Sequence, residues 1–354
     1  MTLPAQPRFA VVGATGVVGR EALAILEERR FPLAGLRLFA SPRSVGTTLP
    51  FAGDDLPVEP LTEASFDDVD LALFCAGGAI SRRFAAVATR AGATVIDNSS
   101  AFRMEDGVPL VVPEINGDAC DGAGGAAPPL VANPNCSTII ALLAVTPLHR
   151  AVGVERMVVS TYQAASGAGR ALMEELERQT REFAAGRPLT TTVAGRPYLF
   201  NVFSHDSAIG PDGYNEEERK LARETRKIWG DEQVRITATC VRVPVLRSHA
   251  EAINLTFRAP LGEGDARALL ADAPGVRLVD DREANAFPEP AVATGRDEVL
   301  VGRIRTDPSQ PRDRGLDLFV CGDQLRKGAA LNAIQIAERL CGIGEEAAAA
   351  ARPA

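Results

Sequence analysis

Short apolar runs alternate with helical patterns through the first 135 residues of the chain. Runs rich in Val, Leu, Ile and Phe predict buried strands at 9–12, 36–40, 71–75 and 94–97. Apolar positions spaced three and four apart predict helices over 21–30 and 81–91. Strands that alternate with helices are typical of a parallel sheet covered on both faces. We therefore expect an α/β domain in this part of the chain.

The pattern changes near residue 136 to a mixture of helices and alternating strands. An apolar run from Ile139 to Val145 follows the turn residues Asn133, Pro134 and Asn135, and it predicts a buried helix that begins near Cys136. Strands are predicted at 157–162, 234–245, 252–257, 299–304 and 316–321, and helices at 171–184 and 215–229. This order indicates a second domain of the α+β class.

The last predicted helix is amphipathic, with apolar positions between Leu325 and Leu340, and we expect it to pack on the first domain. We therefore predict a first domain at 1–135 that is completed by a C-terminal helix within 323–345. The second domain is predicted at 136–322. The alanine-rich tail at 346–354 has little to bury and is expected to be frayed.

A glycine turn, Gly13-Ala-Thr-Gly16-Val-Val-Gly19, joins the first predicted strand to the first helix. Glycines allow the backbone to turn tightly and to approach a pyrophosphate, whose charge the N-terminus of the following helix stabilises. Glycine-rich turns also serve packing alone, so this spacing does not by itself decide between the two roles.

The end of the next strand indicates which dinucleotide such a turn would bind. An NAD-binding fold carries an Asp or Glu there to accept a hydrogen bond from the ribose 2′-OH, whereas this chain reads Ser41-Pro42-Arg43-Ser44. A guanidinium beside hydroxyl groups suits a 2′-phosphate, and we infer NADP over NAD. The alternative is that Arg43 is a solvated loop residue, which is the commoner fate of an isolated arginine.

Cys136 is the candidate nucleophile. A thiol in the first turn of a helix lies near unpaired N–H groups and the positive end of the helix dipole, which stabilise a thiolate and lower the pKa of the cysteine. Most free cysteines are instead small buried apolar residues. The stretch alone favours neither interpretation.

Charge balance and cysteine spacing argue against several classes of protein. The chain carries 38 Lys and Arg against 46 Asp and Glu, a net charge of −8, without a basic block, so we expect no nucleic-acid partner. It shows neither a leader pattern nor an apolar run of about 18 residues, so we expect a cytoplasmic protein without a membrane partner. The six cysteines form no C-x-x-C pair, and we expect neither disulfides nor a metal site.

Several charged residues have roles that the pattern leaves open. Glu217 and Lys220 share one face of the helix at 215–229, which composition alone describes as a solvated helix. Arg242 lies among valines and is either an edge residue or a buried anion clamp. His249 is either a core residue or a proton shuttle, and Arg103 is either an anion ligand or an exposed loop residue.

Taken in order, several motifs resemble those of the aspartate-semialdehyde dehydrogenases. They are GATGVVG at Gly13, FASPRS at Phe39, DNSSAFR at Asp97, VVPEIN at Val111, ANPNCST at Ala132, YQAASGAG at Tyr162, NEEERKLARETRKI at Asn215, VRVPVLRSH at Val241 and QLRKGAALNAIQIAE at Gln324. Each motif alone is weak, whereas the ordered set, which runs from about residue 9 to residue 340, is specific. The chain departs from the family pattern at Gln324, where Asn is usual, and at Ser248, where some members have Gly.

The resemblance implies a Rossmann-type NADP-binding domain and an α+β catalytic and dimerisation domain of the glyceraldehyde-3-phosphate-dehydrogenase-like kind. The family reduces L-aspartyl 4-phosphate with NADPH, reversibly, to L-aspartate 4-semialdehyde and phosphate through a cysteine thioester. This step belongs to the biosynthesis of diaminopimelate, lysine, threonine, methionine and isoleucine. NADP as cofactor, a small-molecule substrate and a homodimer follow from the same resemblance.

The resemblance also implies roles for individual residues. Cys136 would attack the acyl phosphate, Gln163 would orient the acyl group, and His249 would be the acid–base group, suited by a pKa near neutrality. The implied substrate contacts are Arg242 with the α-carboxylate, Glu217 with the α-ammonium, Arg103 and Lys220 with the phosphate, and Asn135. The implied NADP contacts are Gly13, Thr15, Gly16, Val17, Val18, Arg43, Ser44, Ser166, Gly167 and Gln324.

Two other functions remain as alternatives. N-acetyl-γ-glutamyl-phosphate reductases share the glycine turn, the thiol and the acyl-phosphate chemistry, but their acylated substrate has no ammonium group for Glu217 to face. A non-catalytic NADP-binding paralogue would be free to lose Cys136 or His249, and this chain retains both.

Overall fold

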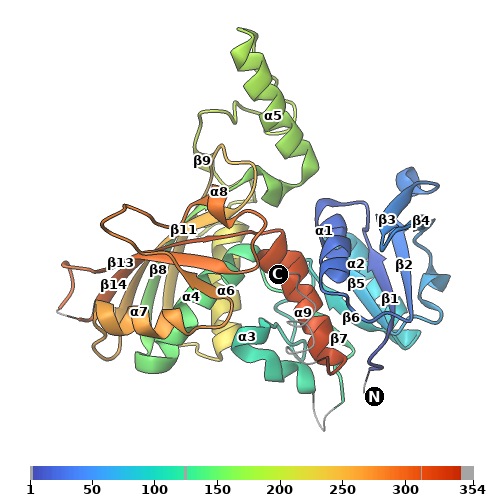
Figure 1. The fold of residues 1–354 in the computed structure, drawn as a ribbon, viewed down its shortest axis with the longest axis horizontal. Coiled ribbons are helices and arrows are strands. Elements are labelled where there is room, and N and C mark those ends of the chain that lie inside the picture. The colour runs from blue at the N-terminus through green and yellow to red at the C-terminus, as the bar shows by residue number, and fades with distance from the viewer. Residues whose placement is uncertain (1–2, 123–125, 312, 344–354) are drawn as a thin grey trace. The chain divides into compact units, whose positions relative to one another are not determined.

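The computed structural model describes residues 3–122, 126–311 and 313–343, so the predicted tail at 346–354 lies outside the described residues. The chain divides into two compact units. The first unit comprises Met1–Asn135 and Ala329–Ala354, and the second comprises Cys136–Gly328. Each unit contains a seven-stranded sheet (Figure 1).

The sheet of the first unit has the strand order β3-β4-β2-β1-β5-β6-β7, and its strands are parallel except for β3. The strands are β1 (Arg8–Val12), β2 (Gly35–Ala40), β3 (Thr48–Phe51), β4 (Asp54–Pro60), β5 (Leu71–Phe74), β6 (Thr94–Asp97) and β7 (Leu130–Ala132). The helices are α1 (Val17–Glu28), α2 (Gly78–Arg90), α3 (Pro113–Asn116) and α9 (Leu331–Leu340). The predicted strands and the predicted α/β class of this region are confirmed.

Helices cover both faces of this parallel sheet. Buried residues of α1 and α9, such as Leu23 and Ile334, share one core with Val11 of β1. Phe84 of α2 packs in a second core with Phe74 of β5. The strand order reverses at β1, which lies between β2 and β5, and ligands of such sheets bind beyond the carboxyl ends of the strands at this point.

The sheet of the second unit has the strand order β12-β13-β14-β11-β8-β10-β9. The strands are β8 (Val154–Gln163), β9 (Phe203–Ser204), β10 (Arg235–Arg242), β11 (His249–Phe257), β12 (Val276–Leu278), β13 (Val299–Thr306) and β14 (Gly315–Gly322). The helices are α4 (Cys136–Val152), α5 (Arg170–Ala184), α6 (Glu216–Trp229), α7 (Glu263–Ala271) and α8 (Pro290–Ala293). Strands β8 and β10 are parallel, whereas β11 is antiparallel to both β8 and β14. The mixed sheet confirms the predicted α+β class.

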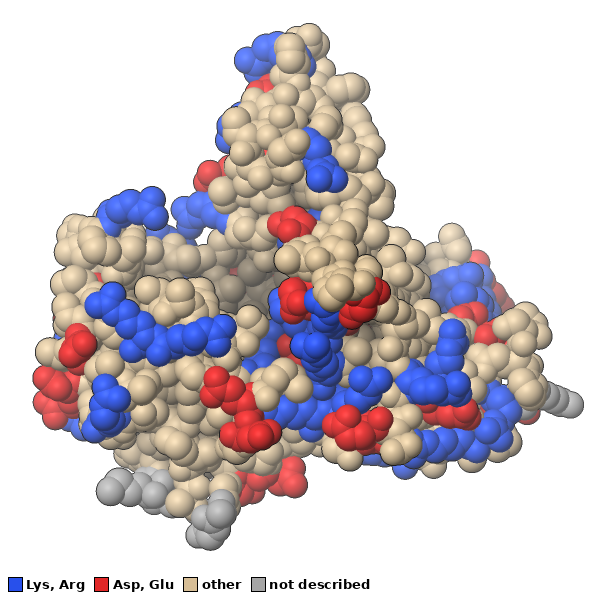
Figure 2. Space-filling view, turned by 180° about the vertical axis from the view of Figure 1, so that it is seen from behind, with Lys and Arg blue, Asp and Glu red and all other residues tan. Residues whose placement is uncertain are grey.

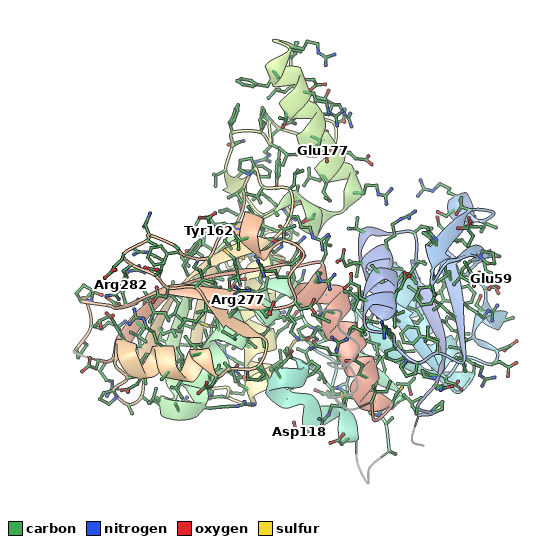
Figure 3. All side chains as sticks on the ribbon, in the orientation of Figure 1. Glu59, Asp118, Tyr162, Glu177, Arg277 and Arg282 are labelled. Atoms are coloured by element: carbon green, nitrogen blue, oxygen red, sulfur yellow. The ribbon has the colours of Figure 1, made fainter. Side chains whose placement is uncertain are left out.

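The long apolar helix α4 begins at Cys136, as predicted. Its residues from Ser137 to Thr146 are buried, and it packs with α6 and α7 on one face of the sheet. Side chains alternate across a strand, so the residues of β8 that face α4 are buried whereas Tyr162, on the opposite face, is exposed (labelled in Figure 3). The sheet therefore has a covered face and a more open face.

Several predicted strand boundaries in this sheet differ from the structure, and two of the differences have a clear cause. The strand predicted at 234–245 ends at Arg242, because Pro244 has no N–H and Val245 instead accepts a hydrogen bond from the N–H of Ala165. The next strand begins at His249 rather than at residue 252, directly after Ser248 in the left-handed region at a φ of 74°. Polar residues occupy buried positions at its start, and a hydrophobic pattern does not detect such a strand.

Other differences concern short elements. The hairpin β3–β4 was not predicted, and neither were α7, α8 and β12. The last helix is shorter than the apolar pattern between Leu325 and Leu340 suggests, because a π-helical turn at Arg326–Ala330 precedes α9.

The surface is mixed in charge. On the face shown in Figure 2, Lys and Arg side chains lie beside Asp and Glu side chains. Within the described ranges, no helix has the length and apolarity needed to cross a membrane.

Candidate active site

The glycine turn lies at the carboxyl end of β1 in the first unit. Gly13 has a φ of 87°, and a Cβ placed on it would lie 2.9 Å from the main-chain carbon of Cys75. A Cβ on Gly19 would lie 2.4 Å from the carbonyl oxygen of Gly13. Both glycines are therefore required by close backbone packing, and the same packing brings the start of α1 next to the end of β1.

The start of α1 has properties expected of an anion site. Gly16 precedes the helix and provides no side-chain cap, so Val17 and Val18 begin it without one. Thr15 Oγ1 lies 3.3 Å from Ser44 Oγ, which belongs to the turn that follows β2. Arg43, in that turn, is exposed. These groups fit a dinucleotide with a 2′-phosphate, since the glycine backbone admits a pyrophosphate while hydroxyl groups and a guanidinium lie at the neighbouring strand end.

Arg103 is buried in the first unit, with 7% of its surface exposed. Its Nε donates to the carbonyl oxygen of Asn133 at 2.9 Å, and its Nη2 donates to that of Asn98 at 2.9 Å. Asn135, at the end of this unit, is also buried. The structure thus places Arg103 among main-chain carbonyl groups and not in an exposed loop.

Cys136 is partly exposed and opens helix α4 in the second unit. A Cβ placed on Gly328 would lie 2.9 Å from the Cβ of Cys136, so only glycine allows the chain to pass so close to this residue. Burial raises the pKa of the other five cysteines, which are Cys75, Cys120, Cys240, Cys321 and Cys341. These five are protonated and unreactive near neutral pH.

Gln163, at the end of β8, connects α4 with α6. Its Nε2 donates to Ser137 Oγ at 2.8 Å and to Glu217 Oε1 at 3.0 Å. The second carboxylate oxygen of Glu217 accepts a hydrogen bond from Lys220 Nζ at 2.9 Å. The amide oxygen of Gln163 is buried and has no partner among the described residues. The charged helix therefore contributes one face to this cluster and is not simply solvated.

His249 is completely buried at the start of β11. Its Nδ1 accepts a hydrogen bond from the N–H of Ala164 at 3.1 Å, which assigns the ring proton to Nε2. Nε2 has no partner in the described part of the chain. Burial, assisted by the Arg242 guanidinium, lowers the pKa of His249 to about 3. The expectation of a pKa near neutrality is therefore wrong, and the ring is neutral at pH 7.

Arg242 is buried and binds Asp206, a residue that the sequence analysis did not single out. Its Nε and Nη2 donate to Asp206 Oδ1 at 3.1 and 2.9 Å, and its Nη1 donates to the carbonyl oxygen of Ala164 at 3.3 Å. Partial burial opposes ionisation of Asp206, but Arg242 outweighs it and holds the pKa of that carboxyl group below its usual value. Arg242 is therefore a buried cation and not an edge residue of the sheet.

The second unit thus brings together Cys136, Gln163, Glu217 and Lys220 through α4, β8 and α6, and it brings together His249 and Arg242 around Ala164. Comparison with known proteins places this arrangement in a family. Residues 8–123 match the family model for the semialdehyde dehydrogenase, NAD binding domain, and residues 145–327 match that for the semialdehyde dehydrogenase, dimerisation domain.

An aspartate-semialdehyde dehydrogenase of Synechocystis sp. is 53% identical over 338 residues, which cover 96% of this chain and 98% of that protein. The chain belongs to the aspartate-semialdehyde dehydrogenase family. The enzyme of that name from Prochlorococcus marinus is 49% identical and covers 94% of this chain and 95% of its own length. Aspartate-semialdehyde dehydrogenase II from Vibrio cholerae, whose structure has also been solved in complex with ASA, has a TM-score of 0.90 at 42% identity over 95% of this chain and 98% of its own.

Gln324 and Ser248, at which the sequence analysis expects departures from the resemblance, contact each other. Gln324 Oε1 accepts a hydrogen bond from the N–H of Ser248 at 2.8 Å, and Gln324 Nε2 donates to the hydroxyl of Ser166. A Cβ on Gly167 would lie 3.0 Å from Nε2 of His249. Three of the predicted NADP contacts, Ser166, Gly167 and Gln324, therefore lie close to the His249 strand.

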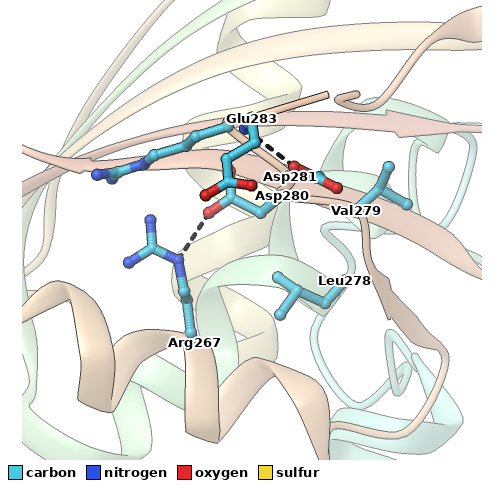
Figure 4. A pocket seen from close by; sticks show the side chains of 7 residues that line it. Arg267, Leu278, Val279, Asp280, Asp281 and Glu283 are labelled. Carbon is cyan, nitrogen blue, oxygen red and sulfur yellow. Dashed lines mark hydrogen bonds and ion pairs between the residues drawn. The ribbon is translucent and has the colours of Figure 1, made fainter. Parts of the chain in front are cut away.

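The second unit also has a pocket that contains none of the residues predicted from the aspartate-semialdehyde dehydrogenase resemblance. It is lined by Arg267, Leu278, Val279, Asp280, Asp281, Arg282 and Glu283 (Figure 4). Arg267 donates to Asp280 at 2.8 Å and to the carbonyl oxygen of Ile304 at 2.6 Å, so its guanidinium group already has partners within the protein. Among the described residues, no group of three His, Cys, Asp or Glu side chains could hold a metal ion.

Sequence reasoning missed Ser137, Asp206 and Gly328 as neighbours of the site. Ser137 follows Cys136 directly, but nothing in its spacing shows that it meets Gln163 across 26 positions. Gly328 lies within the motif that begins at Gln324, so its presence in that motif was the available signal. Asp206 lies in a loop without a pattern, and only its contact with Arg242 reveals it.

Proposed function

We propose that this chain catalyses the reversible, NADPH-dependent conversion of L-aspartyl 4-phosphate to L-aspartate 4-semialdehyde and phosphate. The observation that carries the proposal is the cluster of Cys136, Gln163 and Glu217 around the start of α4, in a chain of this family. A thiol, an amide with a free oxygen and a carboxylate are the groups that an acyl phosphate with an α-ammonium group needs.

Cys136 is the proposed nucleophile. Its Sγ forms a bond to the acyl carbon while the bond from that carbon to the phosphate oxygen breaks, and the bond electrons leave with the phosphate. Arg103 and Lys220 are proposed to bind the departing phosphate, since positive charge stabilises the dianion as it forms. The product of this step is a thioester, and NADPH, when bound, supplies the hydride that reduces it.

His249 is proposed to donate a hydrogen bond and not to exchange a proton. Its neutral ring carries a proton on Nε2, which can donate to the oxygen anion of the thiohemiacetal. Collapse of this anion reforms the C=O bond and expels the Cys136 thiolate, so the atoms and charges balance without a further proton. A neutral donor therefore suffices for this step.

The α-substituents of the substrate are proposed to bind between two residues of opposite charge. Glu217 faces the α-ammonium group, for which an N-acetylated substrate has no equivalent. Arg242 binds the α-carboxylate and in doing so shares its donors with Asp206, which is partly exposed and can yield them. Asn135 is proposed to contact the substrate beside Cys136.

NADP is proposed to bind at the carboxyl end of β1. The main chain of Gly13 and Gly16 and the start of α1 at Val17 and Val18 would meet the pyrophosphate, and the groups that follow β2 would meet the 2′-phosphate. Thr15, Arg43 and Ser44 fit the 2′-phosphate, and Ser166, Gly167 and Gln324 are proposed to complete the site.

A homodimer that uses the open face of the second sheet is also proposed, in keeping with the dimerisation-domain model that matches residues 145–327. Tyr162 and Phe319 lie on that face with ring centroids 6.3 Å apart, and an aromatic pair on a partly exposed sheet suits contact with a second copy. The first unit is proposed as the NADP-binding domain and the second as the catalytic domain.

The test of the function is NADP reduction by purified protein with L-aspartate 4-semialdehyde and phosphate. We expect turnover that requires phosphate and exceeds the rates with N-acetyl-glutamate semialdehyde or with NAD. Cys136→Ser should lower kcat by at least about 10³-fold, because a serine hydroxyl is far less ionised than a thiol, while the Kd for NADPH stays within about twofold. Preference for the N-acetylated substrate, or loss of NADPH binding together with turnover, would contradict the proposal.

A further inference from the structure

Glu251 is a buried carboxyl group that the proposed reaction does not use. It is the third residue of β11, has no exposed surface, and shares a face of the sheet with His249, because side chains two apart on a strand point to the same side. Neither carboxyl oxygen has a hydrogen-bond partner in the described part of the structure. A carboxyl group left unpartnered in a core costs stability, so its presence in this position suggests a role in the site.

The polar surroundings of Glu251 come from the cluster around Gln163. Burial has the largest effect on Glu251 and raises its pKa well above the usual value. The hydroxyl of Ser137 lies beside the carboxyl group and favours its ionised form, whereas the charge of Glu217 opposes ionisation. Cys240 and Cys321, whose pKa values burial raises, are the other titratable neighbours, so no cation among these groups offsets the burial. Burial therefore favours the neutral, protonated form of Glu251.

Ser137 connects this neutral acid to Gln163. Ser137 Oγ accepts a hydrogen bond from Gln163 Nε2, whose other proton is donated to Glu217. Both amide protons of Gln163 are thereby used, and its Oε1 remains the one buried amide atom without a partner. A flipped amide would place Oε1 against the carboxylate of Glu217 and would need the Ser137 hydroxyl as a donor instead of an acceptor. A Ser137 oxygen that presents an acceptor therefore supports the orientation that Glu217 also favours.

We propose that Glu251 is a positioning residue of the active site. The proposed contact is a hydrogen bond in which the Ser137 hydroxyl donates to the carbonyl oxygen of Glu251, so that the Ser137 oxygen presents its lone pairs to Gln163. Gln163 is then held with Oε1 available to a donor group of the substrate. The inference rests on the proposed function for the role of Gln163, but the proposed hydrogen bond between Ser137 and Glu251 can be tested independently of it.

Replacement of Glu251 should separate activity from stability. Glu251→Leu removes the acceptor, and we expect kcat with aspartate semialdehyde to fall at least tenfold while KM changes less than threefold. Tm should stay equal or rise by about 2–4 °C, because an unpartnered polar group has left the core. Glu251→Gln keeps a neutral acceptor and should retain kcat within about threefold. Thr161→Val is the matched control, because Thr161 lies opposite Glu251 on β8, is equally buried and has an unpartnered hydroxyl. This control variant should keep kcat within about twofold of the wild type.

A double-mutant cycle with Ser137→Ala tests the contact itself. We expect the kcat losses of Glu251→Leu and Ser137→Ala to be strongly non-additive, with the double variant close to Ser137→Ala alone. The same cycle can be measured by urea unfolding, which needs no substrate. The change in the free energy of unfolding caused by Glu251→Leu should differ between the wild type and the Ser137→Ala variant. Wild-type kcat in Glu251→Leu, or additive shifts in the unfolding cycle, would overturn the inference. A wild-type protein without turnover, combined with a non-additive unfolding cycle, would instead count against the proposed function alone.

Discussion

At the scale of single residues, the state of each titratable group follows from burial and from its hydrogen-bond direction. His249 was recognisable as a candidate from its sequence context, but an acid–base role required a pKa near neutrality. The structure surrounds the ring with protein, directs the Ala164 N–H at Nδ1 and places Arg242 nearby. All three features disfavour the imidazolium, and the residue becomes a neutral donor.

The stability of the protein should show this neutral state of His249. The pKa of His249 is lower in the folded protein, about 3, than in the unfolded chain, about 6.5, so the unfolded state binds more protons between these values. The wild type should therefore lose stability as pH falls through this window. Between pH 6.5 and 4.5, its free energy of unfolding should fall by on the order of 2 kcal/mol more than that of His249→Gln. Urea unfolding at both pH values measures the difference. The contributions of the other two histidines to the pH dependence cancel, because both proteins contain them. Parallel pH dependence in the two proteins would show that the ring is not held neutral.

At the scale of elements, the start of α6 illustrates how local sequence signals place chemistry. Asn215 caps the helix by accepting from the N–H of Glu218 at 3.0 Å, and Glu218 accepts in return from the N–H of Asn215 at 2.9 Å. The other oxygen of Glu218 accepts from the N–H of Cys240 at 3.0 Å, which ties the helix to β10. Glu217 lies in this first turn, so the capping box also holds a proposed substrate contact.

Removal of this cap should weaken both the helix and the site. Asn215→Ala is expected to cost about 1 kcal/mol, seen as a fall in Tm of about 2–4 °C. KM for aspartate semialdehyde should rise several-fold because Glu217 is less well held. Asn201→Ala, a change of the same type in an exposed loop, serves as the control and should leave KM unaltered. A fall in Tm without any change in KM would mean that the cap does not position Glu217.

At the scale of the molecule, the two units differ in how the faces of their sheets are covered. The parallel sheet of the first unit is covered on both faces, as parallel sheets require. The mixed sheet of the second unit has helices α4, α6 and α7 on one face, whereas residues such as Tyr162 remain exposed on the other. A face of this kind is expected to be covered by association with another molecule.

A charge placed on the open face should therefore change the oligomeric state. Tyr162→Glu introduces a carboxylate where the proposed dimer buries apolar surface, and sedimentation velocity should show a shift from dimer to monomer. Val45→Glu in the first unit is the control, because Val45 is 42% exposed and Tyr162 is 37% exposed. A dimer that survives Tyr162→Glu would place the contact on another surface.

Much of the molecule was predictable because local patterns reflect local physics. Strand β6 matched its predicted range, since a short apolar run between turns reports burial directly. The helix that begins at Cys136 was predictable because its apolar run follows turn residues. The strand that begins at His249 was predicted three residues late, because His249 and Glu251 are polar residues in buried positions.

The sequence by itself determined the two classes of fold, the glycine turn, the thiol at a helix start and the family of the chain. These depend on neighbouring residues, whose periodicity and spacing the chain carries directly. Only the tertiary structure decided that Gln163 donates both amide protons to Ser137 and Glu217, that His249 is neutral, and that Glu251 lies unpartnered beside the site. Such contacts join positions tens of residues apart, and strand register and helix packing, rather than local propensity, determine which side chains meet.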